Sequence, residues 1–225
     1  MLDRALIARF DSTHMHYFIT GTDTDAGKTY VTCLLIEALR CAGHDAVGYK
    51  PLACGDRRDP LAIQQASGGA LSVEEINPIF LKVPASPYAA ALLENRTVDV
   101  EAARQGFYTL TAKHSHILIE GAGGWEVPLA GKDTMADFAA SLKLPIIVVV
   151  NNKLGCLNHT LLTVRNIQHR GLTCAGIILN HAHDERDAAS ISNRMVLQNF
   201  LDVPVLAEII HGETEIDWPE GLAVA

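Results

Sequence analysis

Glycine, lysine and threonine come together in one segment that could bind the phosphates of a nucleotide. The segment GTDTDAGKT spans residues 21–29, between an expected strand and an expected helix. Glycines let the backbone turn its amide hydrogens toward phosphate oxygens, and the start of a helix adds partial positive charge. Lys28 supplies a cation for the outer phosphates, and the hydroxyl of Thr29 is suited to a magnesium ion. The segment predicts phosphoryl transfer from ATP with Mg²⁺ as cofactor.

This phosphate loop is one residue longer than the general pattern GxxxxGK[ST]. Where that pattern places its first glycine the chain has Thr22, and Gly21 comes one position earlier. The alternative is a glycine turn with an incidental lysine. The coincidence of strand, loop, GKT and amphipathic helix favours phosphate binding.

Three further charged residues follow expected strands. Glu120 ends the strand HILIE, where a metal-binding acid belongs in such enzymes, although it could be a solvated strand-end acid. Lys50 ends the second strand and could stabilise the charge on a moving phosphoryl group, or be an exposed lysine. Asp59 lies in the polar run DRRD and on its own fits a surface loop equally well.

Two glycine-containing segments could contact a ligand through their backbones. Residues 121–124, GAGG, either form a tight turn or let the backbone approach a ligand closely. Residues 155–159, GCLNH, precede an expected helix, so their free amides predict a site for a carboxylate or a phosphate.

The elements that must position these residues alternate between strands and helices. Strands are expected at 16–20, 46–49, 116–120, 145–150, 174–180 and 204–208, and helices at 28–42, 60–66, 87–93, 100–112, 158–169 and 187–200. This order predicts an α/β fold of P-loop type, with a doubly wound, mostly parallel sheet flanked by helices. Residues 16–225 are expected to form a single domain, and residues 1–15 a leader or a remnant of expression.

Composition narrows the class of protein. The chain has 225 residues, of which 48% are hydrophobic, and a net charge of −8, which argues against nucleic acid or an anionic membrane as the main partner. Its five cysteines contain no CxxC pair, so neither a zinc ribbon nor a disulfide framework is indicated. Reduced thiols in the cytoplasm fit best.

Five segments, in this order, resemble the dethiobiotin synthetase family. They are GTDTDAGKT (21–29), GYKPLACG (48–55), EGAGGWEVPL (120–129), NKLGCLNHTLLT (152–163) and GIILN (176–180). The longer phosphate loop is this family's own form of the motif, and GAGGW and KLGCxNH are highly specific. The resemblance implies a cytoplasmic ligase of biotin biosynthesis that closes a cyclic urea from 7,8-diaminononanoate and carbon dioxide. The implied enzyme is a homodimer whose active sites lie at the interface.

The resemblance also implies roles for individual residues. Lys28 and Lys50 would flank the carbamate and the γ-phosphate, and Thr24 would lie beside the amines, so these three are the expected catalytic residues. The expected metal ligands are Thr29, Asp59 and Glu120. The expected ATP contacts are Asp25, Ala26, Gly27, Lys28, Thr29, Tyr30, Asp59, Glu120, Gly121, Ala122, Gly123, Asn180, Glu208, Ile209 and Ile210. The expected substrate contacts are Thr24, Lys50, Cys54, Gly121, Ala122, Gly123 and, for the tail carboxylate across the dimer interface, Gly155, Cys156, Leu157 and Asn158.

Three positions depart from the family pattern. Cys54 stands where many relatives carry serine, which replaces a hydroxyl by a weaker thiol donor. The stretch before Asp59 is shorter than in many relatives. Residues 208–210 read EII in place of EIP, next to the expected adenine site.

Two other classes of P-loop protein are alternatives. A partitioning or septum-site switch ATPase usually has a second lysine early in the loop and a basic amphipathic C-terminal helix. Here the loop has Thr22, Asp23 and Thr24, and the chain ends in ETEIDWPEGLAVA. An amide-forming synthetase domain of cobalamin synthesis would lack the KLGCxNH segment.

Overall fold

The computed structural model describes residues 14–184 and 187–222. The expected leader, residues 1–15, lies outside the described residues except for its last two. The first strand begins at Met15, one residue before the expected start.

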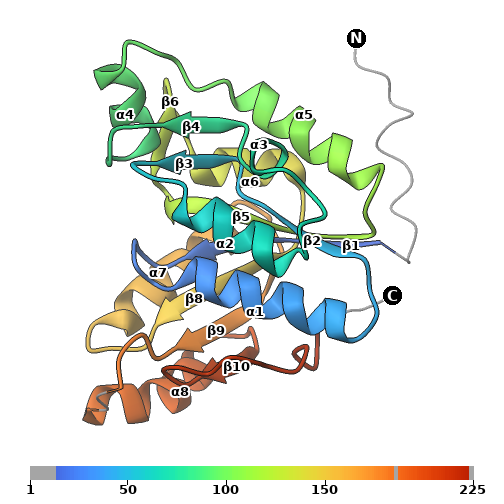
Figure 1. The fold of residues 1–225 in the computed structure, drawn as a ribbon. Coiled ribbons are helices and arrows are strands. Elements are labelled where there is room, and N and C mark those ends of the chain that lie inside the picture. The colour runs from blue at the N-terminus through green and yellow to red at the C-terminus, as the bar shows by residue number, and fades with distance from the viewer. Residues whose placement is uncertain (1–13, 185–186, 223–225) are drawn as a thin grey trace.

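A six-stranded parallel sheet forms the centre of the molecule (Figure 1). Its strand order is β10-β9-β8-β1-β5-β2. The strands are β1 (Met15–Gly21), β2 (Ala46–Tyr49), β5 (His116–Gly124), β8 (Ile146–Asn151), β9 (Cys174–Asn180) and β10 (Val205–Ile209). Their isoleucines, valines and leucines are almost fully buried, because helices cover both faces, except for Val205 and Leu206 in the edge strand β10. The expected doubly wound α/β architecture is confirmed.

Helices flank the sheet on both sides. They are α1 (Lys28–Cys41), α2 (Arg58–Ala66), α5 (Val100–Thr111), α6 (Met135–Leu142), α7 (Cys156–His169) and α8 (Ala188–Phe200). Figure 1 shows α1 and α2 in front of the sheet, where α1 packs on β1, β2 and β5. The chain then reverses direction across the sheet, so right-handed crossovers carry α6 and α7 to the opposite face. There α6 packs on β5, and α7 packs on β8 and β9.

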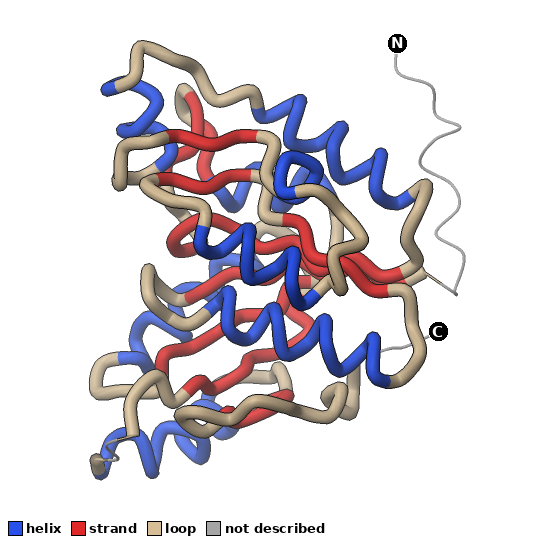
Figure 2. The backbone as a smooth tube through the Cα atoms, viewed as in Figure 1, coloured by secondary structure: helices blue, strands red, loops and turns tan. Residues whose placement is uncertain are grey.

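Smaller elements cover the carboxyl edge of β2 and β5. Strands β3 (Leu52–Cys54) and β4 (Ile79–Leu81) form a parallel pair, and β6 (Pro128–Ala130) and β7 (Asp133–Thr134) form an antiparallel one. Short helices α3 (Val73–Ile76) and α4 (Pro87–Leu93) join them. Figure 2 shows the loops that follow the parallel strands gathered on the left, which is the edge where ligands bind in such sheets. In the described part of the chain, no helix is long and apolar enough to cross a membrane.

Candidate active site

Strand register brings Lys50 and Glu120 together. Tyr49, the last residue of β2, pairs with Ile119 of β5, so Lys50 follows directly beside Glu120. Glu120 in turn pairs with Ile19 of β1, the strand that leads into the phosphate loop. Three adjacent strands therefore deliver a lysine, a carboxylate and a phosphate loop to one edge of the sheet.

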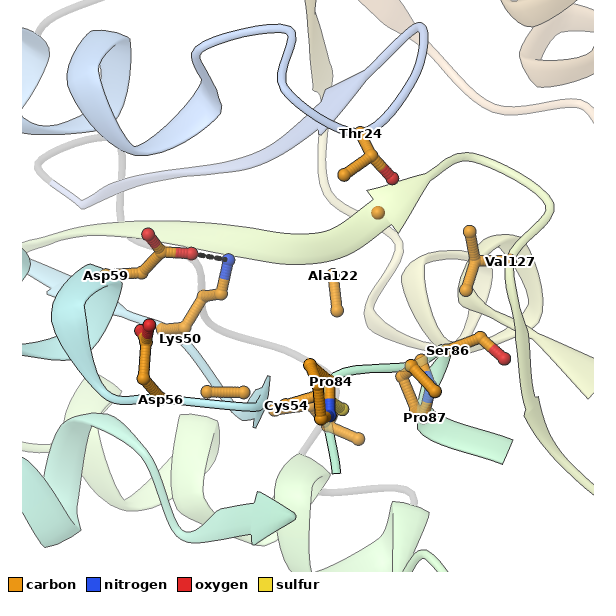
Figure 3. A pocket seen from close by; sticks show the side chains of 14 residues that line it. Thr24, Lys50, Cys54, Asp56, Asp59, Pro84, Ser86, Pro87, Ala122 and Val127 are labelled. Atoms are coloured by element: carbon orange, nitrogen blue, oxygen red, sulfur yellow. Dashed lines mark ion pairs between the residues drawn. The ribbon is translucent and has the colours of Figure 1, made fainter. Parts of the chain in front are cut away.

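A buried ammonium group is shared by two carboxylates. The Lys50 Nζ forms an ion pair with Glu120 Oε1. It forms a second one, at 3.1 Å, with Asp59 Oδ2 (Figure 3). It also donates to the carbonyl of Gly121 at 3.3 Å. Lys50 and Glu120 are almost fully buried, whereas the Asp59 side chain is about half exposed. Burial alone would lower the pKa of Lys50, but Glu120 and Asp59 outweigh it and raise that pKa. Lys50 is therefore a permanent cation.

The phosphate loop ends in a left-handed glycine. Gly27 precedes α1 with φ +85, and a Cβ built there would lie 2.0 Å from Asn180 Nδ2. Asp25, also at positive φ, and the buried Ala26 complete the turn. Among the described side chains none caps α1, and its first turn holds no acid. The first amides of α1 are therefore open to an anion.

Lys28 lies across this loop. Its Nζ donates to the carbonyl of Asp23 at 3.1 Å, and the side chain is mostly buried. Burial lowers the pKa of Lys28, and the nearby charge of Lys50 lowers it further. An incoming phosphate would place negative charge beside Lys28, whose Nζ donates to a backbone carbonyl, whereas Lys50 already has two carboxylate partners.

Oxygen atoms suited to magnesium lie beside these lysines. The Thr29 hydroxyl donates to Glu120 Oε1 at 2.8 Å. The second oxygen, Glu120 Oε2, is buried and has no hydrogen-bond partner among the described residues. With Asp59 this makes one hydroxyl and two carboxylates, the hard ligands that Mg²⁺ prefers. Within the described ranges no group of three or more histidine, cysteine and acidic side chains could hold a metal alone. The set therefore fits an ion that completes its shell with phosphate and water.

A cavity of about 480 Å³ opens beside Lys50. Lys50 and Asp59 line one end, Thr24 the roof and Cys54 the floor (Figure 3). Burial raises the pKa of the Cys54 thiol, so it stays protonated. The complete lining is Thr24, Lys50, Leu52, Ala53, Cys54, Asp56, Asp59, Pro84, Ala85, Ser86, Pro87, Ala122, Gly123 and Val127.

The far wall of this cavity was not expected from the sequence. Residues 84–87 and Val127 line it. Asp56 was not expected either and lies at the other end, near Lys50 and Asp59 (Figure 3). The available signal was the Ser86-Pro87 pair, which starts α4 with proline in its first turn. A second cavity of about 440 Å³ shares Thr24 and Val127 with the first and continues toward α7.

The expected adenine site lies across the phosphate loop from Lys50. Asn180 is buried and donates from Nδ2 to the carbonyl of Ala26 at 3.0 Å, while its Oδ1 has no hydrogen-bond partner among the described residues. Ile209 is buried and Ile210 is partly exposed. The Tyr30 hydroxyl donates to the carbonyl of Glu213.

The carboxylate of Glu208 is turned away from this site. His181 Nε2 lies 2.7 Å from its Oε1, and Arg194 Nη1 donates to its Oε2 at 3.1 Å. Burial favours the protonated acid, but these two partners outweigh it and lower the pKa of Glu208. Both side-chain oxygens of Glu208 therefore have partners within the chain.

The start of α7 is separate from the Lys50 cluster. Gly155 precedes the helix in the left-handed region with φ +90, Cys156 is buried, and Leu157 and Asn158 follow in the first turn. Among the described residues, those lining the two cavities do not include any of these four. Within one chain the structure does not bring this expected carboxylate site to the cavity.

The chain matches known proteins over most of its length. The family model described as "AAA domain" matches residues 15–216. The ATP-dependent dethiobiotin synthetase BioD of Akkermansia muciniphila is 46% identical over 202 residues, 90% of this chain and 95% of that protein. BioD 1 of Escherichia coli K12 is 38% identical over 203 residues, 86% of this chain and 89% of that protein.

Solved structures show the same fold at lower identity. The septum site-determining protein MinD of Pyrococcus horikoshii, complexed with Mg-ADP, has a TM-score of 0.54 and 22% identity, covering 88% of this chain and 81% of that one. A ParA family ATPase of Chlorobium tepidum has a TM-score of 0.53 and 12% identity, covering 89% and 85%. These two similarities concern the fold alone. On the sequence relatives, which match nearly the whole chain, this protein belongs to the dethiobiotin synthetase family.

Proposed function

We propose that this chain closes the ureido ring of dethiobiotin from 7,8-diaminononanoate, carbon dioxide and ATP, as a ligase of biotin biosynthesis. The observation that carries the proposal is the buried Lys50–Glu120 pair, which stands between the phosphate loop and a cavity of about 480 Å³. That arrangement suits a reaction in which a small molecule meets the γ-phosphate of ATP. The names of the family members supply the product.

The reaction has three steps. One amine of the substrate attacks carbon dioxide and loses a proton, which gives a carbamate. A carbamate oxygen attacks the γ-phosphorus, the bond to ADP breaks, and a carbamic–phosphoric anhydride forms. The second amine then attacks the carbamate carbon, phosphate leaves with the bonding electrons, and the cyclic urea closes. The nucleophiles and the electrophiles belong to the substrates, so the protein acts by positioning and by stabilising charge.

The two lysines perform that stabilisation. Lys50 is held protonated by Glu120 and Asp59, so a positive charge faces the cavity throughout the reaction. Lys28 lies across the loop whose amides would hold the phosphates. Negative charge moves from the carbamate onto the transferred phosphoryl group, and a pair of fixed cations stabilises it at both ends of that path. Thr24 lines the cavity where the amines would lie, beside the backbone of residues 121–123.

Magnesium would be held by Thr29, Asp59 and Glu120. The support is the unpartnered Glu120 Oε2 and the Thr29 hydroxyl 2.8 Å from Oε1. When bound, the ion neutralises charge on the phosphate oxygens. The adenine would lie against Asn180, whose free Oδ1 can accept from its amino group, and against the backbone of residues 208–210.

A homodimer completes the site in this proposal. The amide of Cys156 donates to the carbonyl of Lys153 at 3.1 Å, and the amides of Leu157 and Asn158 follow in the first turn of α7. This helix start suits the substrate's tail carboxylate, yet it lies away from the cavity in its own chain. A second subunit that presents this helix start to the cavity would bind the tail. We place the enzyme in the cytoplasm, where its five cysteines, all free, would stay reduced.

The test is ATP turnover by the purified protein with bicarbonate, in the presence and absence of 7,8-diaminononanoate. The expected result is phosphate release that depends on the diamine. Turnover that ignores the diamine would contradict the proposal and favour a switch ATPase.

A further inference from the structure

The Asn166 side chain of α7 makes two hydrogen bonds through one oxygen. Its Oδ1 accepts from the indole Nε1 of Trp125 at 2.8 Å and from Arg170 Nε at 3.0 Å. An amide oxygen has two lone pairs, so these two donors use its full capacity. Trp125 is 4% exposed, and its indole N–H is therefore satisfied by this one side chain rather than by bulk water.

Arg170 fixes the other end of this contact. Its guanidinium donates to Asp137 Oδ1 at 2.8 Å and to both oxygens of Glu126, at 2.9 and 3.2 Å. Asp137 also accepts from the amide and the hydroxyl of Thr134, which starts α6. Asn166 and Arg170 therefore join three parts of the molecule: α7, the start of α6 and the turn after β5.

The glycines that end β5 and the turn that follows them are held by these contacts with α7. Gly123 has φ +67, and a Cβ there would lie 2.7 Å from a methyl of Val127, so a larger residue cannot stiffen this position. Gly124 pairs with Gly21 at the start of the phosphate loop. Trp125 follows immediately, with its ring edge-on to Phe18 at a centroid distance of 6.5 Å. The indole is thus the first large side chain beyond the glycines that can anchor them.

The anchored glycines line the cavity. Gly123 faces the first cavity, while Trp125 and Asn166 face the second, and Thr24 and Val127 are common to both. A displacement of Trp125 would therefore move backbone that faces the first cavity. Gly124 contacts the first part of the phosphate loop, at Gly21 and Asp23. The last part of that loop would be less affected, because Gly27 and Lys28 hold it from α1.

We propose that Asn166 is a positioning residue for ring closure. It fixes Trp125, and through it the Gly121–Gly123 backbone, and so sets the affinity for the diamine without touching it. The inference rests on the proposed function, because it takes these glycines as the diamine's contacts.

The test measures KM for the diamine and for ATP in Asn166→Leu. Leucine keeps similar volume but leaves the buried indole N–H without an acceptor. The expected result is a rise of about tenfold in KM for the diamine, with KM for ATP within about twofold of wild type. Gln168→Leu is the matched control, because it makes the same kind of change at an exposed position of the same helix. It should leave both KM values unchanged.

A second variant separates positioning from general damage. Trp125→Phe removes the donor, so adding Asn166→Leu to it should raise KM for the diamine no further. Effects that multiply in the double variant would overturn the proposal. So would an Asn166→Leu protein that melts at lower temperature with its diamine KM unchanged, since the role is then structural only. A wild-type protein indifferent to the diamine would instead overturn the proposed function, and this inference with it.

Discussion

Buried ionisable groups differ in charge between the two edges of the central sheet, one where the strands begin and one where they end. At the carboxyl edge of β2, burial leaves Lys50 charged, with its pKa raised by Glu120 and Asp59. At the amino edge, burial together with the charges of His14 and His116 lowers the pKa of His16 in β1 to about 4. The carboxyl ends of the parallel strands therefore carry a protonated lysine, and their amino ends a neutral imidazole.

Partners rather than depth decide the difference. Lys50 has two carboxylates within ion-pair distance. His16 instead accepts the amide of Ile117 on Nδ1 and lies 5.6 Å edge-on from Phe107. A buried group keeps its charge when an opposite charge outweighs the loss of hydration, and otherwise becomes neutral. The comparison marks the charged edge as the one built for chemistry.

The largest effect is expected from Lys50→Gln at the charged edge. The variant removes the cation that faces the cavity and leaves Glu120 buried without its ion-pair partner. We expect kcat to fall by at least about a hundredfold, while KM for ATP changes by less than about fivefold. Lys132→Gln, at an exposed position, is the control. A wild-type kcat in Lys50→Gln would contradict the assignment of catalysis to the charged edge.

At the neutral edge, acid should destabilise the protein. Folded His16 stays neutral down to about pH 4, whereas in the unfolded chain it protonates near its ordinary value of 6.5. The unfolded state thus binds more protons, so stability is full above pH 6.5 and falls as pH drops toward 4. The limit for this residue is about 3 kcal/mol.

The variant His16→Asn tests this assignment, because it keeps an acceptor for the Ile117 amide but cannot titrate. Denaturant unfolding between pH 7 and 4 should show a shallower loss of stability than in wild type. The exposed His169→Asn should keep the wild-type slope. If stability fell as steeply with pH in His16→Asn as in wild type, the burial of neutral His16 would not be the cause of that loss.

A smaller effect is expected where the phosphate loop meets β9. Gly27→Ala forces a left-handed alanine and places a methyl 2.0 Å from Asn180 Nδ2. Gly43→Ala has the same backbone strain, φ +90, but no atom within 4 Å of the new Cβ. Strain alone costs about 1 kcal/mol in each. Only Gly27→Ala should also raise KM for ATP, by about tenfold or more. Equal KM values for ATP in the two variants would contradict this close packing.

The smallest expected effect is the dependence of activity on pH. Carbamate formation requires a neutral amine, so the rate should climb from pH 6 to 8 when dissolved carbon dioxide is held constant. The raised pKa of Lys50 keeps that group protonated over this range. If Lys50 lost its proton in this range, the rate would fall instead. A rate that falls as pH rises would therefore indicate that Lys50, at the charged edge, is the group that titrates.

Long elements with regular patterns were predictable. The bounds of β2 and β9 agree with those expected, because each is an apolar run closed by a turn. The pairs β3–β4 and β6–β7 were missed, since two or three residues carry no periodicity and their pairing is tertiary. Helix α6 was also missed, although its capping box at Thr134 and Asp137 was a readable signal.

The residues of the site also divide into those that the sequence could place and those that it could not. Lys28, Thr29 and Glu120 could be placed from the loop motif and the strand ends, because parallel strands deliver their carboxyl ends to one edge. Asp59 read alone fitted a surface loop equally well, and its role came from the family resemblance. In the structure its contact with Lys50 joins it to the cluster. The engagement of Glu208 with His181 and Arg194 joins β9, β10 and α8, which no local pattern encodes.

The most direct test of the charged edge as a ring-closing site follows the carbon of bicarbonate. Purified protein is incubated with ATP, Mg²⁺, 7,8-diaminononanoate and ¹⁴C-bicarbonate, and then acidified. A carbamate releases its carbon dioxide in acid, whereas a cyclic urea retains it. We predict one acid-stable ¹⁴C for each ADP formed, with both lost in Lys50→Gln. ADP formed without acid-stable label would contradict the account.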